Sequence, residues 1–170
     1  MAGLPENFEI RLLEPADSIS ELTALINRAY SQLAEMGLKY VGTWQGEDMT
    51  RKRLKDVECY IGVSNAQIIS TIALRPPGRG KGSPWYLSKD VAIFGQFGVL
   101  LEYRRRGIGT VMVRHCEDRA RQLGAKELAC DTAEPATHLI DWYKRLGYRF
   151  IEYVDWEITN YRSVILSKTL

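Results

Sequence analysis

The stretch that decides the fold is EYRRRGIGTVMVRHCEDRARQLG, which runs from Glu102 to Gly124. Apolar residues recur at helical spacing from Ile108 to Leu123, and Gly124 is a typical helix stop. The first amides of a helix lack intrahelical partners and carry a partial positive charge. Three consecutive arginines and two glycines at such a helix start therefore predict a site where an anionic group approaches the backbone.

Strands are expected on both sides of this helix. VAIFGQFGVLL (Val91–Leu101) precedes it and KELACDT (Lys126–Thr132) follows it, and such a strand–helix–strand unit must cross over right-handed. Pro135 at a first-turn position then starts another helix, and Gly147 ends it. The two closing strands, YRFIEYVDWEI and RSVILSKTL, are expected to pair antiparallel.

The first forty residues predict an edge strand and one helix. FEIRLLEP (Phe8–Pro15) alternates like an edge strand. Ser18 and Glu21 have the spacing of a capping box, so a helix is expected from Ile19. Its apolar stripe continues until Gly37 stops it.

The next segment predicts a hairpin and a long loop. A short helix is expected around Thr50–Lys55, and ECYIGVSNAQIISTIAL (Glu58–Leu74) contains two β-rich runs joined near Asn65. Arg75–Asp90 is rich in proline and glycine, and a loop of this length inside a compact domain is often functional.

Together these elements predict one α/β (α+β) domain over residues 1–170, with a central mixed, mostly antiparallel sheet of six to seven strands and helices on both faces. Apolar residues make up 45% and charged residues 26%, which is ordinary for a soluble domain. The net charge of only +2 argues against a general nucleic-acid-coating protein, so any anion site must be local.

Neither a membrane span nor a metal site is indicated. No apolar run approaches the ~18–20 residues that a span needs, and Met1–Ile10 lacks a signal-peptide core, so a cytoplasmic protein is expected. Cys59, Cys116 and Cys130 lie far apart and, with two histidines, form no convincing zinc set. Reduced, mostly buried thiols are expected.

The glycine pattern fits neither of two common nucleotide-binding motifs. The sequence holds no Gly-x-x-x-x-Gly-Lys-Ser/Thr loop, and Met112 stands where the Gly-x-Gly-x-x-Gly motif needs its third glycine. FGVLLEYRRRGIGTVMV instead resembles the acetyl-coenzyme A signature of the GCN5-related N-acetyltransferase (GNAT) superfamily, with Arg104, Gly107 and Gly109 at the matching positions. YKRLGYRF (Tyr143–Phe150) resembles the second, aromatic signature of that family.

The resemblance implies an enzyme that moves an acetyl group from acetyl-CoA to a primary amine by direct attack in a ternary complex, without a metal. It places the pyrophosphate on the backbone amides of residues 105–110 and the pantetheine arm beside the preceding strand. That strand must then splay from its neighbour, and a bulge at Gly95 or Gly98 would allow this. The implied cofactor-binding residues are Phe97, Gly98, Val99, Arg104, Arg105, Arg106, Gly107, Ile108, Gly109 and Thr110. Of the arginines, Arg104 or Arg106 is expected to reach the phosphates with its side chain.

Tyr143 and Asp131 are the expected catalytic residues. Tyr143 stands where many family members place a tyrosine general acid, and a phenol pKa of about 10 is near that of a thiol, about 8.5. The alternative is one more inward-facing aromatic of its helix. Asp131 ends a strand where some relatives carry a catalytic glutamate, and a water oriented by Gln96 would serve as relay; the alternative is a capping carboxylate. Strand alternation turns Cys130 the other way, toward the core.

One position departs from the family pattern. Ala136 stands where relatives often carry an asparagine that touches the cofactor, so that contact is absent or is replaced by Thr137 or His138. His138 is otherwise a helix-surface residue, and His115 lies on the apolar face of its helix.

The acceptor is expected to be a small-molecule or peptide amine that binds near residues 30–56 and 75–90. Aromatic rings recognise ammonium groups by cation–π contact, and the candidate substrate-binding residues are Tyr40, Trp44, Trp85 and Tyr86; packing of the loops onto the core is the alternative. A homodimer through the last strands is a further expectation from the resemblance.

Two other functions remain open at this level. A non-catalytic acyl-CoA sensor on the same fold would bind acetyl-CoA without turnover. Nucleic-acid binding through Arg104–Arg106 would depend steeply on salt, and the mild net charge argues against it.

Overall fold

The computed structural model describes residues 3–170, in which all strands form one seven-stranded sheet of order β1-β2-β3-β4-β5-β7-β6. The strands are β1 (Glu9–Leu12), β2 (Glu58–Ser64), β3 (Gln67–Arg75), β4 (Val91–Val99), β5 (Glu127–Ala133), β6 (Arg149–Asp155) and β7 (Arg162–Thr169). Neighbouring strands pair antiparallel except β4 and β5, which are parallel. The prediction of a mixed, mostly antiparallel sheet is therefore confirmed.

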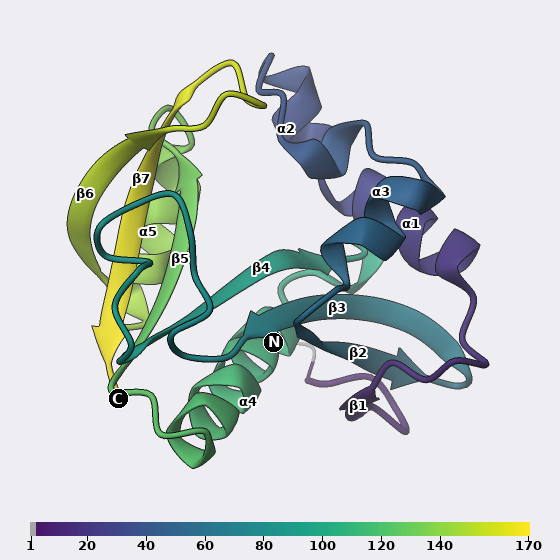
Figure 1. The fold of residues 1–170 in the computed structure, drawn as a ribbon. Helices are drawn as coiled ribbons and strands as arrows, with labels where there is room; N and C mark the ends of the chain where they lie inside the picture. Colours follow the sequence, from purple (N-terminus) through teal and green to yellow (C-terminus); the bar gives the residue numbers. More distant parts are fainter. Residues whose placement is uncertain (1–2) are drawn as a thin grey trace.

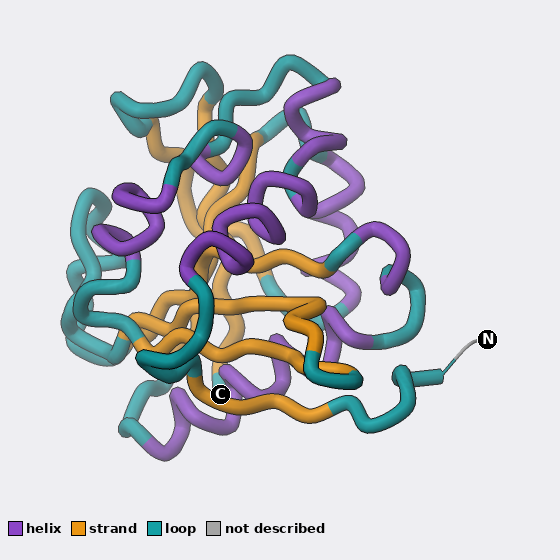
Figure 2. The backbone as a smooth tube through the Cα atoms, turned by 90° about the vertical axis from the view of Figure 1, so that its right-hand side faces the viewer, coloured by secondary structure: helices purple, strands orange, loops and turns teal. Residues whose placement is uncertain are grey.

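The helices lie on both faces of the sheet, as predicted (Figure 1). They are α1 (Ile19–Ala29), α2 (Ser31–Glu35), α3 (Glu47–Arg53), α4 (Ile108–Gln122) and α5 (Thr137–Arg145), with short 3-10 turns at Val41–Thr43 and Leu101–Tyr103. Figure 1 shows α1–α3 above β2–β4 and α4 below them, while α5 lies behind β5 and β7. In the turned view of Figure 2, strands cross the lower half of the molecule with helices above and below.

The sheet opens between its two parallel strands. β4 and β5 pair only from Val91–Ile93 to Glu127–Ala129, and no pairs join them beyond Ile93. The irregularity lies opposite β3, between Thr71 and Ala73, and Gln96 at its centre has φ +44°. The predicted bulge is present and lies between Gly95 and Gly98, but its left-handed residue is Gln96 and not either glycine.

Three local predictions are confirmed by backbone geometry. Ser18 caps α1 by accepting from the Glu21 amide, and the β2–β3 hairpin turns through Asn65 and Ala66, both with positive φ. Gly124 and Gly147, with φ +84° and +99°, follow the ends of α4 and α5. These conformations favour glycine, so the two helix ends could be predicted from the sequence.

Two helix boundaries differ from the prediction. The helix expected to run to Gly37 is divided at Tyr30, so that α1 ends at Ala29 and the shorter α2 follows. Pro135 precedes α5, whose N-cap is the fully buried Ala136. The apolar pattern continues across the break because α1 buries Leu22, Leu25 and Ile26 in the main core and α2 buries Leu33 in a second cluster, with Tyr30 packed against both.

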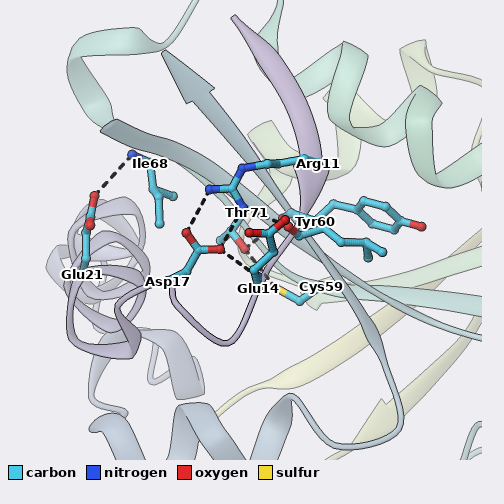
Figure 3. Close-up of polar contacts among 9 residues, drawn as sticks. Arg11, Glu14, Asp17, Glu21, Cys59, Tyr60, Ile68 and Thr71 are labelled. Carbon is cyan, nitrogen blue, oxygen red and sulfur yellow. Dashed lines mark hydrogen bonds and ion pairs between the residues drawn. The ribbon is translucent and has the colours of Figure 1, made fainter. Parts of the chain in front are cut away.

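An ion pair fastens the first strand to the start of α1 (Figure 3). Arg11 donates to both carboxylate oxygens of Asp17, at 2.8 and 2.9 Å, and the Glu14 amide donates to the same carboxylate. Glu21 accepts from the Ile68 amide at 3.3 Å and thereby joins α1 to β3. These contacts hold α1 over the half of the sheet that ends at β4.

Candidate active site

A cleft of about 360 Å³ lies where β4 and β5 part. Residues from the end of β4, the turn before α4, the end of β5 and the face of α5 line it, together with Tyr30 and its neighbours at the α1–α2 junction. The lining includes twelve of the residues predicted from the sequence: Tyr40, Phe97, Gly98, Val99, Arg104, Arg105, Gly107, Ile108, Gly109, Thr110, Asp131 and Tyr143.

The turn before α4 forms a cradle for an anionic group. Gly107 caps the helix with φ +82°, and Arg105 is also left-handed at φ +60°. No side chain caps the helix start, so its first amides keep donors for a ligand. A Cβ at Gly109 would lie 3.3 Å from Phe97 and 3.4 Å from Trp142, and one at Gly98 would lie 2.7 Å from the Ala29 Cβ. The absence of side chains at these glycines keeps the cradle and its floor open, which fits a diphosphate.

The three arginines of this turn have different surroundings. Arg104 turns back into the protein: its Nε donates to the Val99 carbonyl at 3.2 Å and its Nη1 to Gln32 at 2.7 Å, and the Ala29 carbonyl is a third acceptor. Arg106 lies over the Tyr103 ring at 5.5 Å and makes no such contacts to the described chain. Arg106 does not line the cleft, whereas Arg105 is exposed at its edge.

Tyr143 enters the cleft from α5, on the face of the sheet that α4 covers. Its ring is buried among Phe94, Trp142 and Tyr148, with centroids 5.1 to 5.9 Å away. Burial raises the pKa of the phenol well above its ordinary value. The hydroxyl is therefore protonated at neutral pH. It is a weaker acid than a phenol with the ordinary pKa, which the sequence analysis used.

Asp131 enters the cleft from the other face of the sheet. The Tyr86 hydroxyl donates to its Oδ1 at 2.7 Å, and the Trp156 indole donates to its Oδ2 at 3.0 Å. Burial raises the pKa of the carboxyl, while these two hydrogen bonds and the charge of Arg53 act in the opposite direction. A carboxylate of raised pKa with two fixed donors has the character of a base that is held in one orientation.

The loop between β3 and β4 supplies one of those donors. It lies across β5 and β7 (Figure 1) and packs there through Tyr86, with Trp85 and Trp156 around it. Tyr86 is 3% exposed and Trp85 donates its backbone amide to Glu152. Neither lines the cleft, nor does Trp44, which is 48% exposed. The loop thus positions Asp131 instead of presenting its aromatic rings to the cleft.

Tyr40 lines the cleft, but its hydroxyl is occupied by bonds within the protein. Its hydroxyl bonds to the Thr132 hydroxyl at 2.7 Å and accepts from the Ala133 amide at 2.8 Å. It is 9% exposed, and its ring packs at a tilt against Tyr161 with the centroids 4.8 Å apart. These bonds tie the segment after α2 to the end of β5.

Sequence reasoning missed several residues of the site. Tyr30 lines the cleft, and burial raises the pKa of its phenol to about 12. Trp142 stacks on Phe97 at 5.9 Å. Tyr30 could have been found from the sequence, because it stands at the end of a helix and inside the segment that was expected to bind the acceptor. Trp156 is 25 residues from Asp131, and no local pattern joins them.

The remaining predictions concern residues around the site. Cys130 is 2% exposed and packs in the main core, as predicted. His138 lines the cleft from the surface of α5, and His115 packs edge-on against Tyr60 at 4.4 Å. Gln96 bonds to Gln45 and to the Arg53 carbonyl, so its amide is held in a network. Within residues 3–170 there is no group of three or more side chains suited to a metal ion.

Comparison with known proteins places this geometry in a family. Residues 21–148 match the Acetyltransferase (GNAT) family. The chain is 26% identical over 143 residues to S-(2-succino)cysteine N-acetyltransferase of Bacillus subtilis (strain 168), covering 83% of this chain and 82% of that protein. It is equally 26% identical to S-alkylcysteine N-acetyltransferase of the same strain, covering 82% and 78%.

Solved structures share the fold. The crystal structure of a GNAT family acetyltransferase from Elizabethkingia anophelis with acetyl-CoA bound superimposes with a TM-score of 0.70 at 16% identity, covering 97% of this chain and 99% of that one. The chain belongs to the GNAT family. It is an acetyl-CoA-dependent N-acetyltransferase, and acetyl-CoA is its cosubstrate.

Proposed function

We propose that this protein transfers the acetyl group directly to the primary amine of a small molecule, within a ternary complex. One observation carries the proposal: Tyr143 and Asp131 line the same cleft from opposite faces of the sheet, at the point where β4 and β5 separate. A donor and a base on opposite sides of one opening suit a transfer that gives a proton on one side and takes one on the other.

The side of the cleft near α4 holds the cosubstrate. The amides of residues 105–110 and the side chain of Arg105, which is exposed at the edge of the cleft, bind the pyrophosphate. Arg104 instead bonds to Ala29, Gln32 and Val99, and Arg106 does not line the cleft. The thioester arm lies along Phe97, Gly98 and Val99, beside the stretch of β4 that has lost its pairing with β5.

The chain's own residues handle two protons. Acetyl-CoA supplies an activated acyl group as a thioester. The acceptor nitrogen forms a bond to the thioester carbonyl carbon as the carbon–sulfur bond breaks. Asp131 takes the proton that the acceptor nitrogen loses, directly or through one water, and Tyr143 gives its proton to the departing sulfur. An amide of the backbone near Val99 holds the carbonyl oxygen.

The similarity to two enzymes that act on S-substituted cysteines makes such amino acids the first acceptors to test. The experiment is a thiol-release assay on a panel of S-alkylcysteines, other amino acids, polyamines and a peptide amine, with calorimetric titration of acetyl-CoA as a parallel measurement. Turnover with a small-molecule amine supports the proposal. Acetyl-CoA binding without turnover on any amine would instead favour an acyl-CoA sensor.

Three further expectations from the sequence are part of this proposal: a homodimer, a cytoplasmic location and a single domain. Exposed Phe150 and Tyr153 on the edge strand β6 support a homodimer through the last strands, which sedimentation of wild type and Tyr153→Glu would test. The three unpaired cysteines support a reducing, cytoplasmic location. A single sheet running from β1 to β7 supports one domain over the chain. In residues 3–170 no helix is long and apolar enough to span a bilayer.

A further inference from the structure

One charged side chain on the Asp131 face of the sheet has no role in the chemistry above. Arg53 ends α3 and is partly buried, and its Nη1 donates to Gln45 Oε1 at 2.7 Å. Within the described chain it forms no ion pair, whereas nearby Arg51 pairs with Glu47. Burying a guanidinium without a counter-ion is costly, so this arrangement suits an anion that arrives from outside.

A buried amide network holds Arg53 in place. Gln45, which is 1% exposed, donates to Thr50 at 2.8 Å and to Gln96 at 3.3 Å, and Gln96 donates back to the Arg53 carbonyl at 3.3 Å. Gln96 is also the left-handed residue at the bulge of β4. The network therefore fixes the guanidinium relative to the strand that opens the cleft, and strained backbone of this kind clusters at functional sites.

Arg53 lies beside the strand that opens the cleft, because its carbonyl accepts from Gln96, the neighbour of the cleft residue Phe97. Its charge acts on Asp131, Tyr30 and Tyr161, and burial lowers the pKa of Arg53 itself. Asp131 nevertheless takes its hydrogen bonds from Tyr86 and Trp156. The charge of Arg53 therefore lowers the pKa of Asp131 although the two side chains form no ion pair.

Resting on the proposed acetyl transfer, we infer that Arg53 is a specificity-determining residue that binds a carboxylate of the acceptor, so that the acceptor is an amino acid. In an α-amino acid one carbon separates the ammonium from the carboxylate, which matches a base and a guanidinium on the same face. Arginine binds carboxylates with two parallel hydrogen bonds, and Nε and Nη2 of Arg53 have no partner in the described chain.

The experiment compares S-methylcysteine with S-methylcysteamine, which differs by lacking the carboxylate. We expect wild-type kcat/KM to favour S-methylcysteine by about 100-fold or more, because the analogue leaves the guanidinium unpaired. Arg53→Gln should reduce this preference to less than about 10-fold through the KM for S-methylcysteine, with kcat at saturation little changed. Arg51→Gln, with the same change of charge on the same helix, should keep the wild-type preference.

The outcomes separate this inference from the transferase proposal. Equal use of both amines by wild type, or an unchanged preference in Arg53→Gln, would overturn the carboxylate site and leave acetyl transfer intact. A merely structural Arg53 would lower the melting temperature and affect both amines alike. If wild type acetylates no amine, calorimetric binding of S-methylcysteine decides: binding that Arg53→Gln abolishes supports the site, and absence of binding to wild type refutes it.

Discussion

The Tyr86 hydroxyl donates to Asp131 Oδ1 across 2.7 Å, although the two residues lie 45 positions apart in the chain. This bond favours the carboxylate form of Asp131, because it stabilises the charged oxygen. It opposes the effect of burial, which raises the pKa of the same group. The proline- and glycine-rich loop thus influences the pKa of Asp131 through the hydroxyl of Tyr86.

Tyr86→Phe should move the acidic limb of the kcat/KM profile to higher pH. The variant removes a hydrogen bond that holds the pKa of Asp131 down, so the base is protonated, and activity lost, at a higher pH than in wild type. Rates measured across the acid range check this. Tyr153→Phe, at an exposed tyrosine on β6, is the control, and coincident profiles for all three proteins would remove Asp131 as the base.

Tyr143→Phe should lower kcat by about 100-fold or more, in the range that general acids contribute, while acetyl-CoA affinity stays within about threefold. Tyr148→Phe is the matched control, because its ring lies 5.9 Å from Tyr143 and its hydroxyl donates to Glu117. Single-turnover rates and calorimetry provide the two measurements. A Tyr143→Phe enzyme with full kcat would exclude the phenol as proton donor.

Gly109→Glu should weaken acetyl-CoA binding by about 100-fold, since it puts a negative charge and a side chain into the cradle beside Phe97 and Trp142. Arg114→Gln changes the net charge by the same amount on the exposed face of the same helix and should bind normally. Calorimetric titration and a circular dichroism spectrum give affinity and folding. Normal affinity in a folded Gly109→Glu protein would contradict the phosphate site.

Arg104→Gln and Arg105→Gln should affect different properties of the protein. Arg104 bonds to three groups of the protein, so its loss should reduce the free energy of unfolding by about 1–3 kcal/mol and change acetyl-CoA affinity little. Arg105→Gln should leave the free energy of unfolding unchanged and weaken acetyl-CoA binding several-fold, because Arg105 is exposed at the edge of the cleft. Urea unfolding and calorimetry on both variants test the assignment, which the reverse pattern would refute.

Asp17→Asn should destabilise the protein at neutral pH but not in strong acid. The hydrogen bond to Arg11 lowers the pKa of Asp17 to about 2, below its unfolded value, so the stabilisation is present above about pH 4 and disappears as pH falls to about 2. With solvent screening we expect a loss of about 1 kcal/mol at pH 7. Urea unfolding at several pH values, with exposed Glu14→Gln as control, measures it; a pH-independent difference would show that the charge is not responsible.

The sequence by itself determined the elements and the cofactor side of the site. Helix periodicity, the cap at Ser18 and the left-handed glycines 107, 124 and 147 are local properties, since each depends on residues within one turn. The cradle before α4 could be predicted for the same reason, because its amides and glycines are contiguous in the chain.

Only the tertiary structure decided the acceptor side. The bulge falls at Gln96 instead of a neighbouring glycine because Gln45 and Arg53, from another part of the chain, hold its amide. Asp131 meets Tyr86 and Trp156 only after the sheet has formed, and Arg104 donates to the Ala29 carbonyl because the end of α1 lies beside it. Contacts between distant segments follow from how the layers pack, and no spacing along the chain encodes them.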